Sequence, residues 1–246
     1  MNISSAIRYT VRQFINDFLT TYGIFSYQTV YQYEKDLDGR DATIYVNNYY
    51  YPFTATYGAT KLCLIFDDCD YVIKIPIYAN LERNEGRVLS RSRLKNIKMG
   101  KYIAFEGREN YCEKETNLYC AAEEWDINRF FAEEERIITY HGIPIYAQEK
   151  IEEAYEDSDR YIREDDGELL DEVRSVIDRN DYGFDVDAFL DNTNFINDLY
   201  TFDEEGFSAL LDFIEENGIN DLHSGNVGYN RYGEPKIIDY SGFGND

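Results

Sequence analysis

The order of hydrophobic periodicities constrains the fold of this chain most strongly, because strand-like runs come before helix-like runs. Residues 61–66 and 71–77 are rich in β-branched and aliphatic side chains, and the turn-forming segment 67–70 joins them, which predicts a β-hairpin. Three later segments repeat apolar residues at helical spacing, namely 167–179, 186–199 and 203–217. Strands followed by helices are typical of an α+β protein, and we predict one with two lobes.

Weaker patterns fill the rest of the chain. Residues 4–21 form an amphipathic pattern that predicts a helix capped by Ser4 or Ser5 and ended by Gly23. The Tyr-rich region 24–52 predicts short strands, such as 43–46, around a turn at Asp38-Gly39. Further along we predict a helix over 109–124, a strand over 143–151 and a hairpin over 226–239.

Charge is distributed unevenly along the 246 residues, whose formal net charge is −24. Residues 149–216 hold 24 acidic and five basic side chains, a local net of −19, whereas the basic stretch 80–101 holds seven Lys or Arg within 83–101. Our default interpretation of both is a solvated helix face. The functional alternative is an acidic surface for a basic protein partner and a basic flap near an anionic ligand. Long nucleic acid is not expected as a ligand, because its phosphates would be repelled.

Membrane insertion and secretion are not expected either. No apolar run approaches the roughly 20 residues of a membrane-spanning helix, and residues 1–10 lack the pattern of a signal peptide. At 43% hydrophobic and 16% aromatic residues, the chain is too apolar for simple disorder. We therefore expect a cytoplasmic protein, and the abundance of Tyr, Asn, Ile and Asp suggests a bacterial or phage origin.

The segment near the C-terminus carries the clearest chemical pattern. Asp221 is followed five residues later by Asn226, just before a predicted strand, and Asp239 ends the returning strand of the same hairpin. This arrangement is expected to bring two carboxylates and one amide oxygen to one rim. Such hard oxygen ligands suit Mg²⁺, which is usually held by one or two carboxylates together with substrate phosphates. The remaining Asp could accept a proton from an incoming hydroxyl.

The sequence Asp221-Leu-His-Ser-Gly-Asn226 with the later Asp239 resembles the catalytic loop and metal-binding Asp of the protein-kinase-like superfamily. It is most similar to the aminoglycoside phosphotransferase and choline-kinase form of this loop. By that resemblance Asp221 is the catalytic base, and Asn226 and Asp239 are the metal ligands. Ser241 stands where the family has the Gly of its DFG-like element.

Upstream segments resemble the small lobe of the same family. Tyr71 to Ile75 is similar to the strand whose Lys, here Lys74, contacts the α- and β-phosphates of ATP. The resemblance implies Glu115 as the partner of Lys74, with Glu113 as the alternative. The remaining implied nucleotide-binding residues come from the phosphate-covering loop and the adenine-contacting hinge strand, namely Gly58, Ala59, Thr60, Lys61, Gln148, Glu149 and Ile151.

The resemblance implies an antiparallel-sheet small lobe over 1–148, which includes the N-terminal helix and the basic insert 80–101. A reduced, acidic and mostly helical large lobe would follow over 149–246, since the chain ends seven residues after Asp239. The implied function is ATP- and Mg²⁺-dependent phosphoryl transfer to a hydroxyl of a protein or small molecule. Two alternatives stay open: a pseudokinase-like regulatory module that binds a basic protein, and an acidic decoy that mimics nucleic acid.

Overall fold

A computed structural model describes residues 3–23, 25–36, 43–58, 60–77, 110–153, 193–219 and 224–241, together with residues 171, 175 and 222. The chain forms two compact units. The first contains residues 1–113 and 134–148, and the second contains 114–133 and 149–246. Residue 148 was predicted as the domain boundary, and a unit boundary lies there. Residues 114–133, which were assigned to the first domain, group with the second unit instead.

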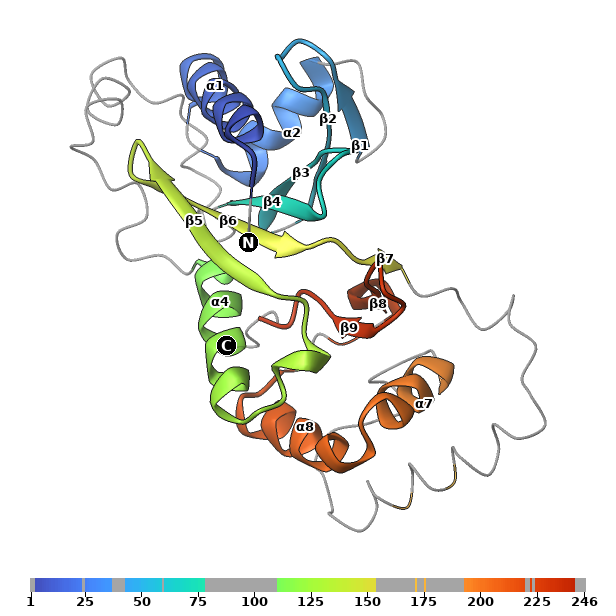
Figure 1. Cartoon of the computed structure of the whole chain (residues 1–246). Helices are drawn as coiled ribbons and strands as arrows, with labels where there is room; N and C mark the ends of the chain where they lie inside the picture. The colour runs from blue at the N-terminus through green and yellow to red at the C-terminus, as the bar shows by residue number, and fades with distance from the viewer. Residues whose placement is uncertain are drawn as a thin grey trace. The chain divides into compact units, whose positions relative to one another are not determined.

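The first unit is built on a six-stranded sheet with the order β1-β2-β3-β4-β6-β5 (Figure 1). Its strands are Thr43–Val46 (β1), Phe53–Tyr57 (β2), Lys61–Ile65 (β3), Tyr71–Pro76 (β4), Glu134–Tyr140 (β5) and Ile143–Glu149 (β6). The pairs β1–β2, β2–β3, β3–β4 and β5–β6 are antiparallel. Together with the helices below, this sheet makes the protein α+β, as predicted.

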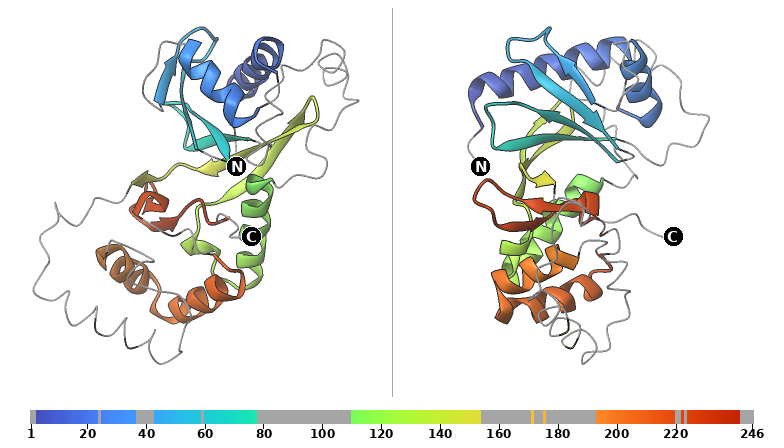
Figure 2. Two further views of the ribbon diagram at one scale, coloured as in Figure 1. Left: turned by 180° about the vertical axis from the view of Figure 1, so that it is seen from behind. Right: turned by 90° about the vertical axis from the view of Figure 1, so that its right-hand side faces the viewer.

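Helix α1 (Ser5–Thr21) covers one face of this sheet (Figures 1 and 2). Ser4 caps it, since its Oγ accepts a hydrogen bond from the backbone N–H of Ile7 at 3.2 Å. The helix ends before Gly23, which has a φ of 101° that glycine adopts without steric cost. The predicted helix and both of its end signals are therefore confirmed.

Helix α2 (Tyr27–Asp36) replaces the strands that the sequence predicted for the first part of 24–52. Val30 and Tyr33, three residues apart, are buried in the first core. Tyr33 packs edge-on against Phe14 and Phe18 of α1. Packing of these aromatic rings on one helix face overrides the β-propensity of the segment's Tyr, Thr and Val residues. The strand at 43–46 is confirmed as β1.

The second unit combines helices with a small sheet. Its elements are α4 (Tyr111–Glu124, whose first turn belongs to the first unit), α7 (Thr193–Phe202), α8 (Glu204–Glu216) and the strands Glu152–Glu153 (β7), Val227–Tyr229 (β8) and Pro235–Ile237 (β9). The strands form a sheet in the order β7-β8-β9. The predicted helices at 109–124 and 203–217 and the hairpin at 226–239 are confirmed within two residues. Of the predicted helix at 186–199, residues 186–192 lie outside the described residues, and α7 covers the rest and extends to Phe202.

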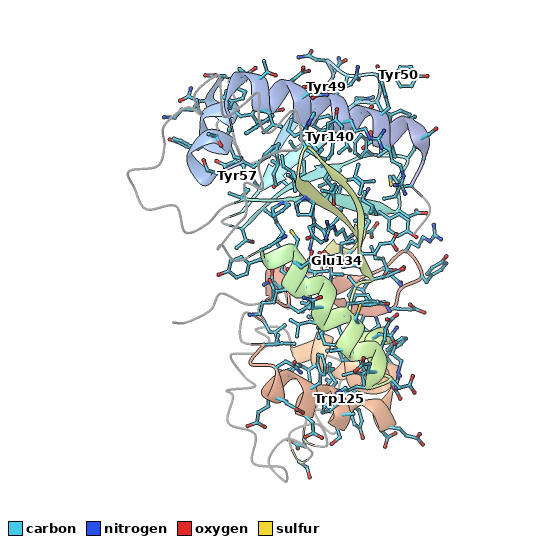
Figure 3. All side chains as sticks on the ribbon, turned by 90° about the vertical axis from the view of Figure 1, so that its left-hand side faces the viewer. Tyr49, Tyr50, Tyr57, Trp125, Glu134 and Tyr140 are labelled. Carbon is cyan, nitrogen blue, oxygen red and sulfur yellow. The ribbon has the colours of Figure 1, made fainter. Side chains whose placement is uncertain are left out.

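Aromatic side chains fill the core of the second unit. Phe131 packs edge-on against both Phe213 of α8 and Tyr240. Trp125, which is labelled in Figure 3, packs edge-on against Phe213 and remains 40% exposed. Asp203 caps α8 by accepting a hydrogen bond from the N–H of Gly206 at 3.1 Å. Within the ranges given above, no helix combines the length and the apolar character that crossing a membrane requires.

Candidate functional site

Lys74, the lysine singled out in the sequence, lies in β4 with its ammonium paired to a buried carboxylate. Its Nζ lies 3.0 Å from Oε2 of Glu134, the first residue of β5. The same oxygen accepts a hydrogen bond from Nε2 of Gln148 at 2.9 Å. Glu134 and Gln148 stand directly opposite each other in the β5–β6 pair. All three side chains are buried, with at most 4% of each residue exposed.

This polar cluster lies on the sheet face that α1 does not cover. Successive side chains of a strand point to opposite faces. Ile73 and Ile75 belong to the core that α1 shares, so Lys74 between them points the other way. By the same alternation, Ala147 points into the core and Gln148 points away from it. One face of the sheet therefore packs against α1, and the other carries Lys74 and Gln148.

The segment predicted to cover phosphates forms the turn between β2 and β3. The N–H of Gly58 donates to the C=O of Lys61 at 3.0 Å, and the C=O of Thr60 accepts from the N–H of Ile77 at 2.8 Å. The second bond joins the turn to the end of β4, three residues beyond Lys74. Ala59 lies outside the described residues. A Cβ on Gly58 would meet no atom within 4 Å, so packing does not require a glycine there.

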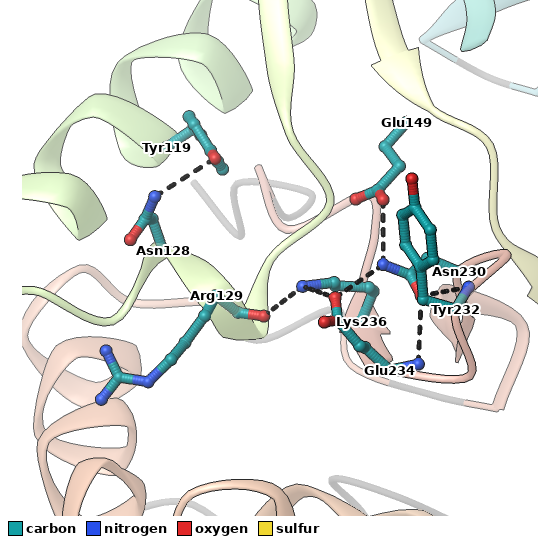
Figure 4. Close-up of polar contacts among 8 residues, drawn as sticks. All are labelled: Tyr119, Asn128, Arg129, Glu149, Asn230, Tyr232, Glu234 and Lys236. Carbon is teal, nitrogen blue, oxygen red and sulfur yellow. Dashed lines mark hydrogen bonds and ion pairs between the residues drawn. The ribbon is translucent and has the colours of Figure 1, made fainter. Parts of the chain in front are cut away.

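The strand predicted to meet adenine is β6, which ends at Glu149. The N–H of Glu149 donates to the C=O of Glu133 at 2.8 Å. Its Oε1 accepts a hydrogen bond from Nδ2 of Asn230 at 3.0 Å (Figure 4). Ile151 is half-buried and its side chain lies against Gly228. These contacts give both residues a structural role in the second unit, and an adenine contact stays a prediction.

Asn226 and Asp239, the predicted metal ligands, flank the β8–β9 hairpin at the same end. Val227 pairs with Ile237, and one step further the C=O of Asn226 accepts from the N–H of Ile238 at 2.8 Å. Asp239 follows Ile238 directly. The register of the hairpin therefore places Asn226 opposite Ile238, the residue before Asp239.

The residues around Asp239 are held by buried contacts. Asp239 itself has a left-handed backbone with φ of 53°, a conformation that Asp adopts more readily than most residues. The hydroxyl of Tyr240 donates to the C=O of Ala132 at 3.2 Å. Oγ of Ser241 donates to Oε1 of Glu115 at 3.0 Å, and Glu115 is fully buried on α4. Glu115 therefore anchors the segment that follows Asp239.

Glu113, the alternative partner for Lys74, accepts a hydrogen bond from the hydroxyl of Tyr146. Asn110 supports this contact, because its Nδ2 donates to the same hydroxyl at 2.9 Å and its Oδ1 accepts from the N–H of Glu113 at 3.2 Å. Burial, followed by the hydrogen bond to Glu113, raises the pKa of Tyr146 far above its ordinary value. The Tyr146 hydroxyl is therefore a protonated donor at neutral pH.

Lys74 and Glu115 belong to different units, so their predicted pairing stays a prediction. Asp221, the predicted proton acceptor, lies outside the described residues, as do the basic stretch 80–101 and most of 154–192. Leu222, which follows Asp221, is buried in the core of the second unit.

Glu134 is the residue that the sequence prediction missed. It is the middle of three consecutive glutamates, residues 133–135, and only the strand alternation of β5 decides which of them faces Lys74. Among the described residues, no group of three His, Cys, Asp or Glu side chains could hold a metal ion. Mg²⁺ does not need such a group, since one or two protein oxygens and substrate phosphates usually hold it.

Comparison with known proteins adds no relative: no protein-family model matches the chain, and neither the curated proteins nor the solved structures give a significant match.

Proposed function

We propose that this protein binds ATP with Mg²⁺ through a kinase-like, two-lobed fold and transfers the γ-phosphoryl group to a hydroxyl. The observation that carries this proposal is the hairpin end at which Asn226 lies beside the Ile238-Asp239 step, joined by a hydrogen bond of 2.8 Å. The sheet-bearing first unit corresponds in this proposal to the small lobe, and the second unit to the large lobe.

The donor atoms fit the metal. Asn226 offers an amide oxygen and Asp239 a carboxylate, and both are hard oxygen ligands of the kind that Mg²⁺ prefers. Bound there, the ion would offset the negative charge of the transferred phosphoryl group. Glu115 and Ser241 support this function by fixing the chain directly after Asp239, with 3.0 Å between Oε1 and Oγ. A fixed ligand costs less conformational entropy when the metal and nucleotide bind.

Lys74 supplies the complementary positive charge in the first unit. Its ammonium, which Glu134 holds at 3.0 Å, is proposed to contact the α- and β-phosphates. Asp221 is proposed to accept the proton of the acceptor hydroxyl as the phosphoryl group moves. The protein therefore contributes mainly positioning and charge, which suffices for this class of reaction.

Phosphoryl transfer by an Asp221→Asn variant tests the assignment of the proton acceptor. We expect the variant to bind MgATP as the wild type does, and to release ADP at least about a hundredfold more slowly, because general-base catalysis contributes 10²–10⁴-fold. ADP release is measured in a coupled assay and transfer to the protein by mass spectrometry. Asp212→Asn, on the exposed side of α8, is the control and should keep the wild-type rate.

Full transfer activity in Asp221→Asn would contradict the proposed role of this residue. If the wild-type protein binds MgATP but transfers no phosphoryl group to water or to itself, the assay is repeated with added protein and small-molecule hydroxyl acceptors. Binding without any turnover would assign the alternative function, a nucleotide-binding regulatory module.

A further inference from the structure

We propose that Glu134, held in place by Gln148, is the residue that positions the Lys74 ammonium for phosphate binding. Glu134 acts through Lys74 and does not itself touch the nucleotide, so it is a positioning residue. This inference rests on the proposed function, because it takes Lys74 as the phosphate-binding cation.

The energetic cost of the pair is the first argument. Lys74 and Glu134 are both 2% exposed, and taking two opposite charges out of water costs several kcal/mol per ion before their attraction offsets it. Apolar residues of similar volume often stabilise a fold as well as or better than such a pair. Stability alone therefore gives little reason to place a lysine here. Binding of an anionic ligand, which needs a fixed positive charge, gives a direct reason for a lysine at this position.

The geometry of the cluster is the second argument. β6 lies between β4 and β5 in the sheet, so the Lys74 and Glu134 side chains meet across an intervening strand. Neighbouring strands are about 4.8 Å apart, so the two side chains together bridge two such steps. Gln148, on the intervening strand, donates to the same Oε2 at 2.9 Å and fixes the carboxylate. The Lys74 ammonium is thereby held at the Glu134 carboxylate before any ligand arrives.

The position of the cluster is the third argument. Lys74 lies on the sheet face opposite the α1 core, and the turn that contains Gly58 and Thr60 is hydrogen-bonded to the end of the same strand. In this proposal the phosphate chain lies below that turn and contacts the three-donor ammonium, which Glu134 already holds at 3.0 Å. Pre-ordering of a long side chain saves the entropy that a mobile lysine loses on binding.

A double-mutant cycle on MgATP affinity tests the inference in the full chain. Calorimetry measures the Kd of MgATP for the wild type, Glu134→Gln, Lys74→Met and the double variant. We expect Glu134→Gln to weaken MgATP by about tenfold, because it removes a charged hydrogen-bond partner. In the Lys74→Met background the same change should have almost no further effect, since Glu134 acts only through the lysine.

Adenosine affinity distinguishes a positioning role of Glu134 from a merely structural role. Adenosine carries no phosphate, so its Kd should be unchanged in Glu134→Gln, whereas general loosening of the first unit would weaken adenosine and MgATP by the same factor. Glu135→Gln is the matched control, because it makes the same chemical change one residue along, opposite Ala147. We expect wild-type affinity for both ligands in this control.

The outcomes separate this inference from the proposed function. Failure of the wild type to bind MgATP overturns both. MgATP binding that Lys74→Met weakens and Glu134→Gln does not overturns the positioning role alone. If Glu134→Gln does not fold, Gln148→Leu replaces it in the cycle, since it removes the amide that holds Glu134 and keeps both charges. An MgATP affinity equal to that of the wild type in this variant would again overturn the positioning role.

Discussion

At the scale of single residues, Asp126 and Asp239 adopt the same unusual backbone conformation for different reasons. Their φ angles are 59° and 53°. Asp126 ends α4 in a Schellman motif, in which the N–H of Ile127 donates to the C=O of Ala122 at 3.0 Å. The position that Asp126 occupies in this motif is usually glycine. Asp239 lies at the end of the β8–β9 hairpin. Left-handed geometry alone therefore does not identify a site, but Asp126 offers a matched control for substitution of Asp239.

Substitution of Gly228 tests how closely β7 approaches β8 in the small sheet. A Cβ at this position would overlap the backbone C=O of Glu152 in β7 and the side chain of Ile151. We expect Gly228→Ala to lower the free energy of unfolding by about 1–3 kcal/mol, as overpacking does elsewhere. Gly58→Ala is the control and should change stability by less than about 0.5 kcal/mol, because its Cβ meets open space. Equal urea unfolding curves for both variants would refute the close approach of β7 to β8.

The partner of Lys74 shows what residue-level reading of the sequence could not decide. Residues 133–135 are identical in type, so the choice among them depends on the register between β5 and β6. That register contains an irregularity between Arg136 and Ile138, which no local pattern indicates. Lys74 was predictable as a lysine within an apolar strand, whereas its carboxylate partner, Glu134, was not.

At the scale of elements, periodicity predicted the structure wherever one face of an element is strongly apolar. Helix α1 and the strands β3, β4 and β6 lie where the sequence placed them. Strand β5 was not predicted, because its charged residues obscure the alternation of apolar and polar positions. Helix α2 was mistaken for strands, because its burial depends on aromatic rings from elsewhere in the chain. The second failure comes from packing between elements.

The β8–β9 hairpin contains an acid whose charge contributes to its stability. Nδ2 of Asn230 donates to Oε2 of Glu234 at 2.8 Å, and Nζ of Lys236 lies 3.3 Å from the same oxygen (Figure 4). The hydrogen bond from Asn230, together with the charge of Lys236, lowers the pKa of Glu234 below its ordinary value, against an opposing effect of burial. A lowered folded-state pKa stabilises the fold above the unfolded-state pKa, and this contribution is lost as the pH falls through the folded-state pKa.

Glu234→Gln should therefore flatten the acid limb of the stability curve. Between about pH 5 and pH 3, where an unfolded Glu takes up its proton, wild-type stability should fall more steeply than that of the variant. Urea unfolding at a series of pH values measures both slopes. Identical slopes would show that the Asn230 and Lys236 contacts do not favour the ionised form.

At the scale of the whole molecule, the α+β class was predictable from the order of strands and helices, and the chain does divide into two units. The described part of the acidic region supports the default interpretation of its charge, a solvated helix face. In α8, Glu204, Asp212 and Glu215 are exposed, while Phe207, Leu211 and Ile214 are buried. These acids form the solvent side of an amphipathic helix. The kinase-like assignment instead depends on Lys74, Asn226 and Asp239 serving one nucleotide, which no periodicity can predict.

Thermal unfolding with MgATP tests that central claim most directly. At an ATP concentration about a hundredfold above Kd, binding should stabilise the wild type by about 2.7 kcal/mol, and Tm should rise by several degrees. Asp239→Ala should lose most of this rise. Asp126→Ala removes an Asp from the same backbone conformation and should keep the full ligand-induced rise in Tm. No rise in the wild type, or an equal rise in Asp239→Ala, would contradict a nucleotide–metal site at the end of the β8–β9 hairpin.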